Sequence, residues 1–118
     1  MKQILSVILI FPALALCATV VNSFDAPDTG ISGLAWDGTN LWAVDGTTQY
    51  VYELDPSNGD VLSSFYIMDQ ISWCNPVPGG FTYLENTLYV IMYDGSTYGH
   101  AYMYETGGAY LGHFDVYC

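Results

Sequence analysis

The stretch GLAWDGTNLWAVDGTTQYVYELDPSNGDVLSSF, residues 33–65, holds four short runs of aromatic and β-branched residues separated by three turn signals. The signals are Asp37-Gly38-Thr39-Asn40, Asp45-Gly46-Thr47-Thr48 and Asp55-Pro56-Ser57-Asn58-Gly59. Glycine supplies the positive φ that tight hairpins need, and proline presets the first corner of a turn. The stretch therefore predicts four strands joined in an antiparallel meander.

The same pattern returns further along the chain. Gly33-Leu34-Ala35-Trp36 corresponds to Gly80-Phe81-Thr82-Tyr83, 47 residues later, and the run from Gly59 to Phe65 corresponds to Gly108 to Phe114, 49 residues later. A four-stranded unit repeated at this period is typical of β-propeller blades. We therefore predict an all-β fold with a lone outer strand at 19–24, one blade at 32–66 and a second at 79–115.

The second strand of each predicted blade is almost continuously apolar, as in Leu41–Val44 and Leu88–Met92. Such runs are typical of strands that are covered on both faces, which is the situation of blades that stack. We expect Trp36 to be buried between blades, in which case Trp36→Ala costs about 3–5 kcal/mol of stability.

Two blades do not close a ring, because propellers need about four to eight of them. Two interpretations remain open: the chain is the N-terminal part of a longer protein, or several copies form a homo-oligomer that closes the ring. We favour the longer protein.

The N-terminus has the features of a signal peptide. A short positive segment, Met1-Lys2-Gln3, precedes an apolar run from Ile4 to Ala18 that is short for a transmembrane helix. We predict a signal peptide at 1–18, with lipidation of Cys17 disfavoured because Leu16 replaces the small residue of a lipobox. The mature chain is predicted to be secreted or held at the cell surface, with no membrane segment.

The charge balance limits the partners. The sequence has 12 acidic residues and one basic residue, Lys2, which lies in the predicted signal peptide. Nucleic acids and anionic membranes are therefore excluded as partners, since phosphate binding depends on Lys and Arg. An unknown ligand or protein partner with cationic character, or a divalent ion, stays open.

Two cysteines remain after export, Cys74 and Cys118, in a compartment where disulfides persist. Both fall in linkers that follow a fourth strand, so a Cys74–Cys118 disulfide is conceivable. Either cysteine could instead pair with a segment of a longer protein. Their spacing, with no CxxC motif, does not indicate a zinc site.

The best candidate binding surface is the rim formed by the loops between second and third strands and by the linker between blades. We predict Asp45, Asp94, Tyr98 and Trp73 as binding residues, since an aromatic ring with carboxylates could hold a sugar or a cationic group. In the alternative interpretation, the aspartates only open turns and Trp73 packs beneath its linker.

The motifs of common enzymes are missing from this sequence. It contains no GxSxG elbow, P-loop or dinucleotide fingerprint. His100 and His113 fall in the third and fourth strands of the second blade without a recognisable ligand pattern, so we interpret them as sheet or surface histidines. We predict no catalytic residue, no metal site and no cofactor.

The motif GLAWDG-x-x-LW followed by Y-x-LDP-x-x-G-x-V-x-x-SF resembles the blade repeat of secreted bacterial β-propeller repeat proteins. Gly80-Phe81-Thr82-Tyr83-Leu84 with Leu88-Tyr89 is also similar to repeats of propeller-type glutamine cyclotransferases. The acidic Gly-Glu-Gly-like run of that family corresponds here to Pro78-Gly79-Gly80, so no catalytic residue is transferred. The resemblance implies an exported, non-enzymatic segment with a structural or binding role. The alternative is an incomplete propeller enzyme of cyclotransferase or lyase type whose active centre needs further blades.

Overall fold

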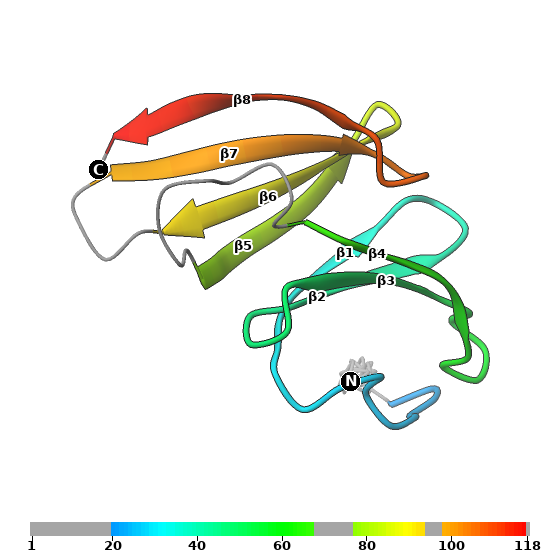
Figure 1. Cartoon of the computed structure of the whole chain (residues 1–118). Coiled ribbons are helices and arrows are strands. Elements are labelled where there is room, and N and C mark those ends of the chain that lie inside the picture. Colours follow the sequence, from blue (N-terminus) through cyan, green and yellow to red (C-terminus); the bar gives the residue numbers. More distant parts are fainter. Residues whose placement is uncertain (1–19, 68–76, 94–97, 118) are drawn as a thin grey trace, which may run out of the picture.

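The computed structural model describes residues 20–67, 77–93 and 98–117, with the side chains of Val77, Tyr98 and Tyr117 excepted. These residues form two four-stranded sheets, each with its strands in sequence order and antiparallel (Figure 1). The strands are β1 (Ile31–Trp36), β2 (Leu41–Asp45), β3 (Tyr50–Leu54), β4 (Val61–Tyr66), β5 (Val77–Leu84), β6 (Thr87–Tyr93), β7 (Tyr98–Glu105) and β8 (Tyr110–Tyr117). The all-β prediction and the two predicted meanders are confirmed.

Aspartate side chains close the turns of the first sheet. Asp37 Oδ1 accepts hydrogen bonds from the two backbone amides after Gly38, both at 2.7 Å, and Asp55 Oδ1 accepts one from the Ser57 amide at 2.8 Å. The first turn of the second sheet uses backbone conformation instead, with Glu85 and Asn86 at φ angles of 48° and 63°. Two consecutive positive φ angles match the twist of a tight hairpin.

The two sheets share register as well as strand order. Gly33 pairs with Val44 in the first sheet, and Gly80 pairs with Ile91 in the second. A register irregularity directly precedes each of these glycines. A second irregularity occurs between the third and fourth strands of both sheets, at Glu53/Leu54 and at Met103/Tyr104.

The hydrophobic core lies between the two sheets. Strand β1 approaches β5 closely, since a Cβ atom added to Gly33 would lie 2.7 Å from Phe81 Cβ. Buried side chains from both sheets meet there. They are Ala35, Trp42, Val44, Val51 and Ile67 from the first half of the chain, and Leu88, Val90, Met92, Tyr102 and Tyr104 from the second.

Trp36 does not lie in this core, so it is not buried between these two sheets, and its burial against a further blade stays a prediction. Successive side chains of a strand point to opposite faces, and in β1 it is Ala35 that faces the second sheet. Trp36 therefore lies on the opposite face and is 52% exposed. The tryptophan buried between the sheets is Trp42, at 1% exposure.

The segment before β1 runs along the face of the first sheet that points away from the second sheet (Figure 1). Asn22 Nδ2 donates a hydrogen bond to the Ser57 carbonyl at 2.7 Å, which ties the segment to the β3–β4 turn. Residues 20–24 form no strand. The outer strand predicted there would need a further sheet as its partner, so it stays a prediction. None of the described residues belongs to a helix that could cross a membrane.

Candidate functional site

The predicted rim residues are only partly described. Trp73 and Asp94 lie outside the described residues, as do Cys74 and Cys118. Tyr98 begins β7, but its side chain is not among those described. The rim binding site and the Cys74–Cys118 disulfide therefore stay predictions. Among the predicted binding residues, Asp45 is the one whose side-chain contacts the structure describes.

Asp45 is the last residue of β2 and is fully buried. Its Oδ1 accepts hydrogen bonds from the amides of Thr47 at 2.7 Å and Thr48 at 2.6 Å. Its Oδ2 accepts one from the Gly30 amide at 3.0 Å. The carboxylate thus joins the β2–β3 turn to the segment that enters β1, which is the geometry of a turn-closing residue.

The hydrogen bonds to Asp45 set its ionisation. Burial raises the pKa of the Asp45 carboxyl by disfavouring the charged form, but the hydrogen bonds from Thr48, Thr47 and Gly30 lower it by more. The pKa of folded Asp45 is therefore below its ordinary value of 3.8. The folded state holds this carboxylate more strongly in its charged form than the unfolded chain does.

A pH dependence of stability follows. Because the pKa of Asp45 is depressed on folding, its stabilisation is present above about pH 4 and is lost as the pH falls through the folded-state value. We expect Asp45→Asn to lower the free energy of unfolding at pH 6, and we expect the difference from the wild type to shrink toward pH 2.5.

Urea denaturation of both proteins at several pH values measures this difference. Asp25→Asn, a change at an exposed aspartate before β1, is the matched control. A difference between wild type and Asp45→Asn that is constant over the whole pH range would contradict the assignment.

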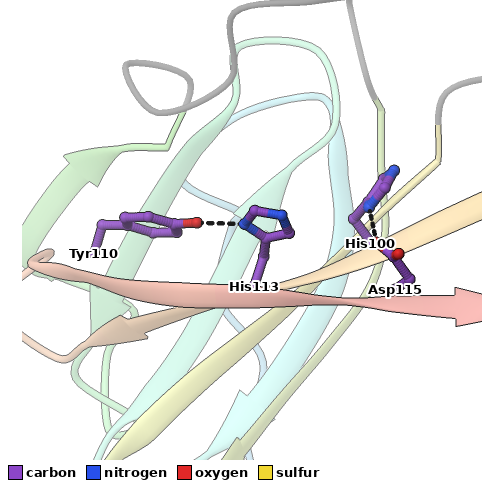
Figure 2. Close-up of polar contacts among 4 residues, drawn as sticks. All are labelled: His100, Tyr110, His113 and Asp115. Atoms are coloured by element: carbon purple, nitrogen blue, oxygen red, sulfur yellow. Dashed lines mark hydrogen bonds and ion pairs between the residues drawn. The ribbon is translucent and has the colours of Figure 1, made fainter.

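A separate polar cluster occupies strands β7 and β8. The register pairs His100 with Asp115 and Tyr102 with His113. His100 Nδ1 lies 2.9 Å from Asp115 Oδ1, and the Tyr110 hydroxyl lies 2.6 Å from His113 Nδ1 (Figure 2). Side chains of adjacent strands that project from one face of a sheet come together in this way.

Aromatic rings connect this cluster to the core. The ring of His113 stacks on that of Tyr102, with centroids 5.2 Å apart, and meets the edge of the His100 ring at 6.0 Å. Tyr104 continues the row into the core, where its hydroxyl donates to the Ile67 carbonyl at 2.9 Å. Burial raises the pKa of the Tyr104 hydroxyl, which stays protonated as a donor.

The cluster of His100, His113 and Asp115 is the grouping that sequence reasoning misses. One ligand atom from each residue lies within 4.8 Å of those of the other two. His113 and Asp115 are two residues apart, the spacing that puts side chains on one face of a strand. His100 lies on β7 and comes close to them because β7 pairs with β8. A search for ligand motifs along the sequence does not detect residues that are brought together by strand pairing.

Each sheet also has an outer face with exposed apolar side chains. On the first sheet, Leu34 and Trp36 are 58% and 52% exposed. Beside Leu34, a hollow of about 310 Å³ lies between the sheet and the segment from Asn22 to Pro27. On the second sheet, Phe114 and Tyr93 are each 49% exposed.

No protein-family model matches the chain, and no curated protein matches it.

Proposed function

We propose that the chain is a segment of an exported β-propeller with a structural or binding role and no catalytic role of its own. Its outer sheet faces bind further sheets of the same repeat. The observation that carries this proposal is an equivalence of positions. The exposed apolar residues of each outer face occupy positions that, in the other sheet, are packed in the core or against it.

The outer face of the second sheet is the counterpart of the covered face of the first. In the first sheet, Trp42, Val44 and Val51 are buried against the second sheet, with Phe65 packed beside them. The residues at matching register positions of the second sheet are Tyr89, Ile91, Ala101 and Phe114. None of the four belongs to the core cluster between the sheets. Phe114 is 49% exposed and Tyr89 and Ile91 are partly exposed, whereas Ala101 is fully buried.

The outer face of the first sheet is the counterpart of the covered face of the second. Phe81, Tyr83 and Leu88 of the second sheet pack in the core. Their counterparts in the first sheet are Leu34, Trp36 and Leu41. Leu34 and Leu41 line the hollow described above. An incoming sheet would share this face with the segment from Asn22 to Pro27, beside which Leu34 is 58% exposed.

Two complementary faces at opposite ends of one chain make a head-to-tail interface, which closes into a ring or extends as a filament. The occupant that we propose is a second copy of this chain, whose second sheet covers the first sheet of its neighbour. In a longer protein, further blades would take the same place. The export part of the proposal depends on the signal peptide predicted at residues 1–18.

Light scattering on a sizing column tests the interface. We expect the purified protein to associate, and we expect Phe114→Glu and Leu34→Glu each to yield monomers, because each places a charge on one of the two faces. Mixed together, the two variants should form a dimer and nothing larger, since only one intact pair of faces remains.

Leu62→Glu is the matched control. Leu62 is 52% exposed on the edge strand β4, and it belongs to neither set of face residues, so association should persist. A wild-type protein that stays monomeric at high concentration would refute the proposed partner. Association that survives both face variants would refute the proposed surfaces.

A further inference from the structure

We propose that His100, His113 and Asp115 form a binding site for a divalent transition-metal ion of the zinc class. Their ligand atoms lie within 4.8 Å of one another. Two ligand atoms of one tetrahedral zinc ion lie about 3.3–3.6 Å apart, as Zn–N and Zn–O bonds of about 2.0–2.2 Å require. The three side chains therefore need to close by up to about 1.5 Å around the ion, which is within the reach of side-chain rotations.

The chemistry of the donors selects the ion. Two imidazoles and one carboxylate suit zinc, copper, nickel and cobalt, whereas calcium and magnesium prefer sites made of oxygen atoms alone. The chain as a whole is acidic, with 12 acidic residues, and its only Lys or Arg is Lys2. Within the described part of the chain, the partner seen for Asp115 is His100, which is itself one of the three proposed ligands.

The hydrogen bond of His113 fits the role of a ligand. Its Nδ1 lies 2.6 Å from the Tyr110 hydroxyl. A metal-binding histidine usually donates its other ring N–H to an oxygen, which fixes the tautomer and the orientation of the ring. With the proton on Nδ1 and the Tyr110 oxygen as acceptor, Nε2 carries the lone pair for the metal. Tyr110 is then a positioning residue.

The cluster is specific to the second sheet. The residues at the matching positions of the first sheet are Tyr50, Ser64 and Tyr66. There the rings of Tyr50 and Tyr66 pack against each other, with centroids 5.4 Å apart. The first sheet forms the same strand pairing with two tyrosines and a serine at these positions. The pairing of β7 with β8 therefore does not require the two histidines and the aspartate.

Two variants exchange the residues at these matching positions between the sheets and so test the metal site. Replacing His100→Tyr, His113→Ser and Asp115→Tyr together inserts the residues of the first sheet, which should keep the fold and remove the site. The reciprocal change, Tyr50→His with Ser64→His and Tyr66→Asp, should create a second site. The three changed side chains of the first sheet are all exposed, so the substitutions leave the core intact.

Isothermal titration of the untagged, chelator-treated protein with Zn²⁺ measures binding, with Ca²⁺ as the negative probe. We expect one ion per chain in the wild type, none in the triple variant and two in the reciprocal variant. His113→Ala should weaken binding by about 100-fold or more, and Tyr110→Phe by about 10-fold or more. Co²⁺ absorption should report nitrogen and oxygen ligands without thiolate bands.

The cysteines provide the decisive control, because thiolates also bind zinc. Binding should survive Cys74→Ser with Cys118→Ser. Zn²⁺ binding that disappears in the cysteine variant, that persists in the triple variant, or that is absent from the wild type would overturn the proposal. Tight Ca²⁺ binding at the same residues would overturn the assignment of the ion.

Discussion

Trp42→Ala should lower the free energy of unfolding by about 3–5 kcal/mol. Trp42 is 1% exposed and lies in the core between the two sheets. Its indole Nε1 donates a hydrogen bond to Asp37 Oδ2 at 2.8 Å, so truncation also removes a contact that holds the β1–β2 turn. The loss combines the cost of a cavity between the sheets with the loss of a charge-assisted hydrogen bond.

Chemical denaturation followed by far-ultraviolet circular dichroism measures the effect. Trp36→Ala is the matched control at protein concentrations too low for association, since Trp36 is 52% exposed in the single chain, and we expect it to change stability by no more than about 0.5–1 kcal/mol. Trp42→Phe keeps an aromatic ring in the core and should fall between the two. If the two alanine variants were equally stable, the observed register of β1 and β2 would be contradicted.

Gly33→Ala should destabilise the protein by about 1–3 kcal/mol, the usual cost of overpacking. The added Cβ would lie 2.7 Å from Phe81 Cβ, 3.1 Å from Val44 Cγ1 and 3.4 Å from the Phe81 amide nitrogen. Two of these atoms belong to, or are attached directly to, the backbone of β5. The strain can therefore be relieved only if the two sheets move apart.

Gly79→Ala is the control for this effect. A Cβ added to Gly79 would have no atom within 4 Å, so the change should be neutral or slightly stabilising through the lower entropy of the unfolded chain. Equal effects of the two substitutions on the denaturation midpoint would show that β1 and β5 do not meet at Gly33.

Much of the fold could be predicted from local patterns. Asp37-Gly38 and Asp55 to Gly59 place turns where the structure has them, and the apolar runs between them become β2 and β3. The correspondence between the two halves of the sequence also predicts the register, because Gly33 and Gly80 occupy the same position in the pairing of their sheets. Turn chemistry and strand periodicity are properties of neighbouring residues, so the sequence carries them directly.

For the candidate site, the burial of Asp45 and the contacts of its carboxylate could not be predicted from the sequence. Its position after an apolar strand and before Gly46 is compatible with a turn residue and with an exposed ligand of the rim. The structure buries it completely and directs three backbone amides at its carboxylate. One of these amides belongs to Gly30, which is 15 residues away in the sequence, so this hydrogen bond could not be predicted from the residues around Asp45.

By itself, the sequence determined the all-β class, the eight strands found in the described residues, the aspartate turns and the negative net charge, since each depends on composition or on residues close together in the chain. The tertiary structure decided which face of each strand is covered. It buried Trp42 and exposed Trp36, because β1 turns Ala35 toward the second sheet. It also brought His100 to His113 and Asp115, because only the pairing of β7 with β8 joins residues that lie on opposite strands of one hairpin.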